Sequence, residues 1–195
     1  MQRALHEARL AGLVGDTLLA VEHSSVYTLG RSASFSHILW NATELETRGV
    51  EVVEADRGGD VTFHGPGQVV VYPVIDLAAR RLGVAAYVSL LEDAMISVLR
   101  GYGLDGVRDG RGRGVWVGDA KIGFVGIRVS RHVTMHGIAL NVSPDLSMFD
   151  GIIPCGLSGC AITSMEKELG RPVGFGEVRD RLLDTLSAAL GDFGD

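Results

Sequence analysis

The sequence predicts an α+β protein in which a mixed, largely antiparallel sheet packs against helices. Strand-like runs follow one another in groups instead of alternating strictly with helices, which disfavours repeated βαβ units. The pair Gly118-Asp119 separates two of these runs, as is typical of an antiparallel hairpin. Residues 84–99 and 175–190 carry apolar side chains at helical spacing, so we expect two amphipathic helices.

The other elements follow from the same signals of period, caps and turns. Gly49 is expected to end a short helix with a threonine N-cap, and a strand should stop at Pro73 or just beyond it. In chain order we expect a helix over 1–13, strands over 17–23 and 26–29, a helix over 43–48, a half-buried strand over 50–55, an apolar strand over 68–75, the helix over 84–99, a meander over 115–117, 121–129 and 133–142, and the helix over 175–190. The helix over 84–99 should bury Ala85, Val88, Leu91, Met95, Val98 and Leu99.

Length and composition are those of a globular protein. The chain has 195 residues, of which 46% are hydrophobic and 22% charged, so we expect one domain over residues 1–195. The first residues lack a secretory signal and no apolar run is long enough to span a membrane, so a cytoplasmic protein is expected. The net charge of −6 argues weakly against nucleic-acid binding. In a reducing compartment Cys155 and Cys160 should be thiols.

A glycine-rich segment, residues 57–68, is the first candidate for a binding site. It is too polar and too rich in glycine for a core segment, so we expect a loop between two strands. Gly58-Gly59 permits a tight turn, Arg57 can pair with a carboxylate or phosphate, and His64 can exchange a proton near neutral pH. The residues leave a plain hairpin loop with a solvated histidine equally open.

The strand that begins near Lys121 is the second candidate. Gly123 and Gly126 remove side-chain bulk between apolar residues, which could leave a slot for an alkyl chain. The alternative is close packing against a neighbouring strand. For Lys121 the alternative is an ordinary solvated lysine at a strand end.

Cys155 is the third candidate because it lies in a Pro-Cys-Gly turn after the last strand of the meander. A structural cysteine more often lies within a strand or helix, whereas a cysteine in a tight turn can be exposed and reactive. A thiol is mostly protonated at neutral pH, and a nearby cation such as Lys121 would favour the thiolate. Cys160 lies in a less constrained stretch and is interpreted as structural.

Five strings of residues, in this order along the chain, resemble one known family. They are Glu22-His23 with Val26-Tyr27-Thr28-Leu29-Gly30-Arg31; Arg57-Gly58-Gly59 with His64-Gly65-Pro66-Gly67-Gln68; Lys121-Ile122; Thr134-Met135-His136-Gly137 with Ala139-Leu140-Asn141-Val142; and Pro154-Cys155-Gly156. The family is that of the octanoyltransferases of lipoate assembly, the lipoyl(octanoyl) transferases. Two departures are Ser24-Ser25, where the family often has prolines, and Asp60, where many members carry an uncharged polar residue.

The resemblance implies a function and a set of site residues. An octanoyl group would pass from the phosphopantetheine of acyl carrier protein to Cys155 as a thioester, and then to a lysine of a lipoyl domain in a 2-oxoacid dehydrogenase complex or of the glycine-cleavage carrier protein. Lys121 would favour the thiolate and shuttle protons, with no further cofactor and no metal. The acyl-binding residues would be Arg57, Gly58, Gly59, Asp60, Val61, Thr62, Phe63 and His64, then Phe124, Val125 and Gly126, then Gly137, Ile138 and Ala139. The fold implied is that of the biotin and lipoate protein ligase catalytic domain.

Two other functions fit the same residues, and a group of arginines could form a docking surface. An ATP-dependent lipoate or biotin ligase of the same fold would need no nucleophilic cysteine, whereas a non-enzymatic metal or carrier-binding module would use Cys155, Cys160, His132 and His136. The cysteine spacing is unlike that of a usual structural zinc site. Arginines close in sequence to the Lys121 strand could dock an acidic carrier protein or simply solvate a loop. They are Arg108, Arg111, Arg113, Arg128 and Arg131.

Overall fold

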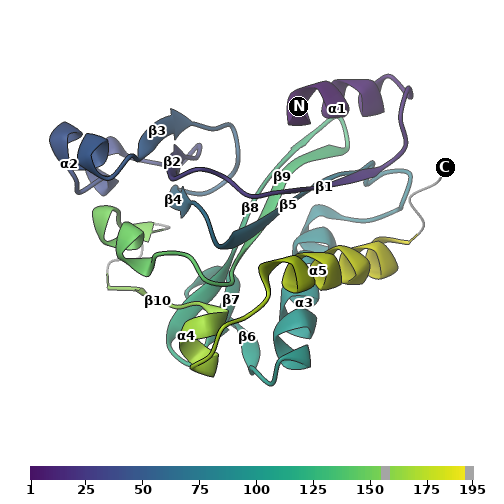
Figure 1. The fold of residues 1–195 in the computed structure, drawn as a ribbon. Helices are drawn as coiled ribbons and strands as arrows, with labels where there is room; N and C mark the ends of the chain where they lie inside the picture. Colours follow the sequence, from purple (N-terminus) through teal and green to yellow (C-terminus); the bar gives the residue numbers. More distant parts are fainter. Residues whose placement is uncertain (155–158, 192–195) are drawn as a thin grey trace.

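The computed structural model describes residues 1–154 and 159–191, so Cys155 lies outside the described residues (Figure 1). In chain order the elements are α1 (Gln2–Leu10), β1 (Thr17–Val21), β2 (Val26–Leu29), the 3₁₀ turn η1 (Phe35–His37), α2 (Ala42–Thr47), β3 (Glu51–Glu54), β4 (Val61–His64), β5 (Gln68–Val74), α3 (Val84–Gly101), β6 (Gly106–Asp109), β7 (Gly112–Val117), β8 (Ala120–Ser130), β9 (Val133–Asn141), the 3₁₀ turn η2 (Leu146–Gly151), β10 (Ala161–Ile162), α4 (Met165–Leu169) and α5 (Phe175–Leu190). No helix in these ranges is long and apolar enough to cross a membrane.

Two sheets form the framework of the described residues. The larger one has the strand order β1-β5-β9-β8-β7-β6, and β10 adds to β8 as a parallel neighbour. All its other pairings are antiparallel. The smaller sheet has the order β3-β2-β4, with β2 and β3 parallel. The predicted α+β class with a mixed, largely antiparallel sheet is therefore confirmed.

The two faces of the larger sheet support different cores because side chains alternate along each strand. Val69 and Val71 of β5 pack with the buried faces of α3 and α5, whereas Val70 between them packs toward the smaller sheet. Figure 1 shows α3 and α5 together on one side of the large sheet, with α2 and the smaller sheet on the other. The second face, between the two sheets, is where a cavity forms.

The long elements were predicted well from their periods. The terminal helix α5 spans the predicted residues and buries Val178, Leu182, Leu186 and Leu190. The meander of β7, β8 and β9 is present, with a turn at Gly118-Asp119. The first helix, the helix α3 and both early strands are also confirmed. On α3, however, Ala85 is exposed, and two residues that were not expected to be buried, Tyr87 and Glu92, are buried.

Short elements show where the local pattern misleads. The N-cap of α2 is Asn41, not a threonine, because Asn41 and Glu44 form a reciprocal capping box. Strand β3 is exposed along its whole length, not half-buried, since it lies at an edge of the smaller sheet. The end of β5 is an exception, because the strand stops at Val74, just beyond Pro73, as predicted; the proline is tolerated since the ladder from β5 to β9 ends at Val71.

The prediction of a loop throughout residues 57–68 is wrong. Val61 to His64 form β4, and all four residues are buried. They pair with β2 in antiparallel register, from Leu29 opposite Val61 to Val26 opposite His64. This pairing satisfies the backbone hydrogen bonds of a short strand that the glycines on either side made hard to predict.

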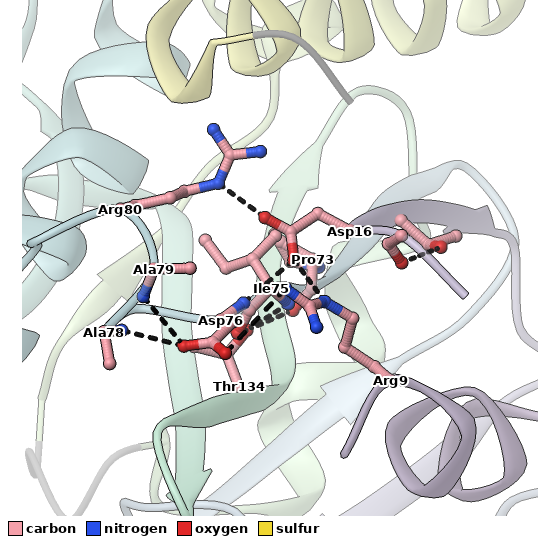
Figure 2. Close-up of polar contacts among 11 residues, drawn as sticks. Arg9, Asp16, Pro73, Ile75, Asp76, Ala78, Ala79, Arg80 and Thr134 are labelled. Carbon is pink, nitrogen blue, oxygen red and sulfur yellow. Dashed lines mark hydrogen bonds and ion pairs between the residues drawn. The ribbon is translucent and has the colours of Figure 1, made fainter. Parts of the chain in front are cut away.

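An ionic cluster fastens α1 to the large sheet (Figure 2). Asp16 accepts hydrogen bonds from Arg9 Nε at 2.7 Å, Arg80 Nε at 2.5 Å and the backbone N–H of Asp76 at 2.9 Å. Burial would raise the pKa of Asp16, but the bonds from Arg9, Asp76 and Arg80 hold it below its ordinary value. The cluster thus fixes the start of β1 and, through Arg9, the helix that precedes it.

Candidate active site

A cavity of about 580 Å³ lies between the large sheet and the smaller sheet. Its walls contain most of the residues expected at the site, although these come from three distant segments of the chain. They are Arg57, Gly58, Gly59, Asp60, Val61, Thr62 and His64; Lys121, Phe124, Val125 and Gly126; and Gly137, Ile138 and Ala139. Phe63, also expected there, lies behind the wall, where its ring packs edge-to-face on Tyr27 and Phe149. Alternation along β4 explains this, because Phe63 points away from the face that Thr62 and His64 present.

Two paired glycines shape the floor of the cavity. Gly126 of β8 lies opposite Gly137 of β9, and Phe124 lies opposite Ala139. A Cβ atom at Gly126 would come within 3.1 Å of the Arg57 side chain, and one at Gly137 would collide with the backbone of β5 at Val71. The missing side chains therefore permit both close strand packing and a slot beneath Arg57.

Arg57 forms the roof of the slot and is only 7% exposed. Its Nη2 donates to Thr28 O at 2.5 Å and to Thr28 Oγ1 at 2.8 Å, and Nη1 donates to Gly58 O at 3.1 Å. The N–H of Gly58 in turn donates to Ile127 O at 2.8 Å on the large sheet. The glycine-rich segment is thus tied to both sheets around the cavity.

Lys121 is 2% exposed, so the alternative of a solvated lysine at a strand end is wrong. Its Nζ lies 4.7 Å from the ring centroid of Trp116 and 5.2 Å from that of Phe124, at distances typical of cation–π contacts. Gly114 makes room for the lysine stem, since a Cβ atom there would lie 2.8 Å from Lys121 Cε. Trp116 was not among the residues expected at the site, although a two-residue turn at Gly118-Asp119 pairs it with Lys121 across the hairpin, and this register was the signal that could have found it.

A polar group of rings lines the β5 side of the cavity. His23 Nε2 lies 2.7 Å from Tyr72 Oη, and the His23 and His64 rings are 5.6 Å apart. Burial lowers the pKa of His23 and raises that of Tyr72 to about 12. These side chains are therefore neutral near pH 7 and act as hydrogen-bonding groups. His23 lay within the strings that carried the family resemblance, whereas Tyr72 gave no sequence signal beyond its place in an apolar strand.

His136 occupies a strained position at the far end of the floor from Lys121. Its φ angle is 57°, within strand β9, and its Nε2 lies 2.6 Å from Asp56 Oδ1. Asp56 also pairs with Arg128. Burial lowers the pKa of His136 while the carboxylate opposes that change. Because β8 advances about 3.3 Å per residue, Lys121 lies roughly 20 Å from Ile127, the partner of His136.

The arginines considered for docking a carrier protein lie in two separate places. Arg111 and Arg113 line the cavity, and Arg108 and Arg113 pair with the buried Glu92 of α3. Arg128 lies at the opposite end of β8, in the ion pair with Asp56. Arg128 therefore lies apart from Arg111 and Arg113.

Among residues 1–154 and 159–191, no group of three or more His, Cys, Asp or Glu side chains is placed to hold a metal ion. His136 faces Asp56, and His132 lies in the hairpin turn between β8 and β9. Cys160, interpreted from the sequence as structural, is partly exposed just before β10. The proposed nucleophile Cys155 lies outside the described part of the chain.

Comparison with known structures places the fold. A bipartite archaeal lipoate protein ligase from Thermoplasma acidophilum, studied together with its E2 lipoyl domain, is 18% identical with a TM-score of 0.76, covering 98% of this chain and 79% of that one. Lipoate-protein ligase A bound with ATP is 17% identical with a TM-score of 0.75, over 96% of this chain and 78% of that one. At these identities the likeness concerns the fold, which is that expected from the sequence.

Sequence comparison is more specific. The family described as lipoyl protein ligase A/B catalytic domain matches residues 1–187. An octanoyltransferase of Chloroflexus aggregans is 49% identical over 191 residues, covering 96% of this chain and 86% of that protein. An octanoyltransferase of Syntrophobacter fumaroxidans is 48% identical over 178 residues, covering 91% and 78%. The chain therefore belongs to the octanoyltransferase family, built on the lipoyl protein ligase A/B catalytic domain, and is an acyltransferase.

Proposed function

We propose that this protein moves an octanoyl group from the phosphopantetheine thioester of acyl carrier protein to a lysine of a lipoyl domain, through a thioester on Cys155. The observation that carries the proposal is the buried Lys121 in the wall of a largely apolar slot. The same slot contains the three segments that the family resemblance assigns to acyl binding. A structural neighbour studied with its lipoyl domain supports the class of acceptor.

In the first step the Cys155 thiolate attacks the carbonyl carbon of the donor thioester. A new C–S bond forms, the bond to the pantetheine sulfur breaks, and the pantetheine thiolate leaves and takes up a proton. The ammonium of Lys121 would stabilise the attacking thiolate and can supply that proton. The donor is already activated as a thioester, so this step needs no nucleotide and no other cofactor.

In the second step the acceptor lysine attacks the acyl-enzyme. A C–N bond forms, the C–S bond to Cys155 breaks, and one proton leaves the amine. Lys121, in its amine form, is the proposed acceptor of that proton and later returns it to the sulfur. Thioester to amide is the downhill direction, which makes the thiolate a suitable relay.

The slot accounts for retention of the acyl chain. Each buried methylene contributes about 0.8 kcal/mol, so an eight-carbon chain gains several kcal/mol from the apolar floor. Phe124 and Ala139 supply apolar contact, Gly126 keeps the floor beneath Arg57 free of a side chain, and Gly137 lets β9 pack closely on β5. Binding would therefore depend on the width of the floor as well as on the charges around it.

Intact mass spectrometry tests the relay. Wild-type protein exposed to octanoyl-acyl carrier protein should gain the mass of one octanoyl group, and Cys155→Ala should gain none and lose transfer to the lipoyl domain. Cys160→Ala is the matched control and should behave as wild type. Full activity of Cys155→Ala, or acylation that moves with Cys160, would contradict the mechanism.

The ATP-dependent ligase is the second candidate, because a ligase bound with ATP shares the fold. It predicts product from free octanoate and ATP, and no dependence on Cys155. The transferase predicts product from the carrier thioester without ATP. Running both donor systems with the wild-type protein separates the two.

A further inference from the structure

A buried hydrogen-bond chain runs from the backbone just after β10 to a histidine in the cavity wall. Asn141 Nδ2 donates to Thr163 O at 2.9 Å, and Asn141 Oδ1 accepts from Gln68 Nε2 at 2.9 Å. Gln68 Nε2 also reaches Phe63 O at 3.3 Å, and Gln68 Oε1 lies 2.6 Å from His64 Nδ1. Gln68, Asn141 and Thr163 are fully buried. Water therefore does not compete for these bonds.

Two backbone carbonyls fix the direction of every bond in this chain. A carbonyl oxygen can only accept, so Thr163 O requires the NH₂ group of Asn141, and Phe63 O requires that of Gln68. The Oε1 atom of Gln68 is then an acceptor, and His64 Nδ1 must carry the proton that it donates. A neutral imidazole has one N–H, so Nε2 of His64 presents an unprotonated lone pair.

That lone pair faces the cavity. His64 lines the cavity and is 9% exposed, and its Nε2 makes no hydrogen bond to any residue in the described part of the chain. In the same residues, His64 Nε2 is not one of the buried polar atoms that lack a hydrogen-bond partner, so this atom is open to the cavity. Burial lowers the pKa of His64 to about 4, although the bond to Gln68 acts in the opposite direction. The ring is therefore neutral near pH 7, with an acceptor directed at the slot.

The same chain also bears on Lys121. The N–H of Thr163 donates to Lys121 O at 3.0 Å, and Ile162 of β10 lies beside Lys121 in the sheet. The amide of Asn141 thus holds, on one side, the segment that pairs with the Lys121 backbone and, on the other, the residue that orients His64. One buried network sets the places of both polar groups.

We propose that His64 Nε2 accepts a hydrogen bond from a substrate N–H during acyl transfer, and that Gln68 and Asn141 are positioning residues that hold it in this tautomer. The inference rests on the proposed function. Both substrates carry an N–H near the reacting carbonyl, namely the pantetheine amide of the donor and the amine of the acceptor lysine. A neutral acceptor suits an apolar slot, where a charged imidazolium would be costly to desolvate. No proton moves to His64, so both transfer steps balance as written above.

Separate half-reactions test the role and identify the N–H. Acyl-enzyme formation is followed by intact mass with S-octanoyl-pantetheine and with S-octanoyl-propanethiol, which lacks the amide. Transfer is followed from preformed acyl-enzyme to a lipoyl domain. His64→Phe should slow one N–H-bearing step by roughly ten- to a hundredfold, the loss expected for a buried hydrogen bond. Acylation by the propanethiol ester should fall by much less than that step, and His64→Gln, whose amide oxygen can replace Nε2, should recover most of the rate.

Each outcome decides the proposal. If His64→Phe slows only acylation by S-octanoyl-pantetheine, the donor amide supplies the N–H that His64 accepts. If it slows only transfer to the lipoyl domain, the acceptor lysine supplies it. Equal loss with every substrate, or no loss with any, overturns the role, provided that the melting temperature shows a folded variant. No acyl-enzyme from the wild-type protein with either ester would reject the proposed function itself.

Nitrogen NMR of the histidines gives a readout that does not depend on activity. In wild-type protein near neutral pH, His64 should appear as a neutral ring protonated at Nδ1. Gln68→Ala should lose this single tautomer, because the acceptor for Nδ1–H is gone. A wild-type ring that is charged, or protonated only at Nε2, would overturn the assignment.

Discussion

Arg57 and Lys121 are both cations buried in the wall of one cavity, yet their described surroundings differ. The guanidinium of Arg57 meets oxygen atoms, those of Thr28 and Gly58, at hydrogen-bond distance. Such acceptors fix both the position and the orientation of a planar fork. Arg57 therefore acts as a clamp that joins the glycine-rich segment to strand β2 over the slot.

The ammonium of Lys121 lies between the faces of Trp116 and Phe124. An aromatic face attracts a cation through its quadrupole and constrains its direction little, so the two rings add to the other interactions of this ammonium. This arrangement suits a group whose partner atoms change during a reaction. The comparison shows that the contacts of Arg57 tie two segments of the chain together, whereas the two rings place the charge of Lys121 in the wall of the slot.

The largest expected effect on the rate of acyl transfer comes from removing Lys121. Lys121→Ala should lower the rate of acyl transfer by about 10²- to 10⁴-fold, the range for a group that transfers protons, with the fold retained. Steady-state transfer to a lipoyl domain and a thermal melt would measure the two effects. A variant with near-normal alkylation of Cys155 would contradict the role in forming the thiolate.

Arg57→Met should mainly destabilise the fold. The variant leaves the oxygens of Thr28 and Gly58 without their donors in a buried place, at a cost of about 3 kcal/mol in the free energy of unfolding. Urea unfolding measures this, with Arg57→Lys as the matched variant that keeps the charge but not the fork. A stable but inactive Arg57→Met protein would show that the clamp also takes part in chemistry.

Lowering the pH should lower the free energy of unfolding through His64, which lies in the same cavity wall as Arg57. The pKa of His64 is about 4 in the folded protein and 6.5 in the unfolded chain, so between these values the unfolded chain binds the extra proton. Stability is therefore lost as the pH falls from about 6.5 toward about 4, by at most about 3 kcal/mol. Urea unfolding of wild type and His64→Gln across this window isolates the contribution, since His23 and His136 remain in both. Parallel curves would contradict it.

Trp116→Leu should give the smallest of these effects on rate. Losing one cation–π contact of about 1 kcal/mol predicts a five- to tenfold slower acylation of Cys155. Trp116→Phe keeps an aromatic face and should remain close to wild type. If both variants slow the reaction equally while melting alike, the ring face is not what stabilises Lys121.

The elements that were predicted correctly are those whose signal is local. The helical period of α5 and the turn of the β7–β8 hairpin depend on residues that are neighbours in the sequence, and the structure confirms both. Strand β4 was not predicted because its burial comes from pairing with β2, whose residues precede it by 32 (Leu29 to Val61) to 38 (Val26 to His64) positions. Asn41, not a threonine, caps α2 because the reciprocal bond with Glu44 decides among the polar residues near a helix start.

The sequence by itself determined the α+β class, the apolar faces of the long helices, and a short list of residues suited to acyl transfer. These follow from periods of two and 3.6 residues and from side-chain chemistry, which neighbours along the chain fix. Only the tertiary structure decided that Lys121 is buried against Trp116, that Arg57 clamps Thr28, and that a carbonyl at Thr163 sets the tautomer of His64. Arg57 and Thr28 lie far apart in the sequence, as do Asn141 and Thr163, so strand order and register determine that they meet. Lys121 and Trp116 are close in sequence, but only the packing around the β7–β8 hairpin decides that they are buried together.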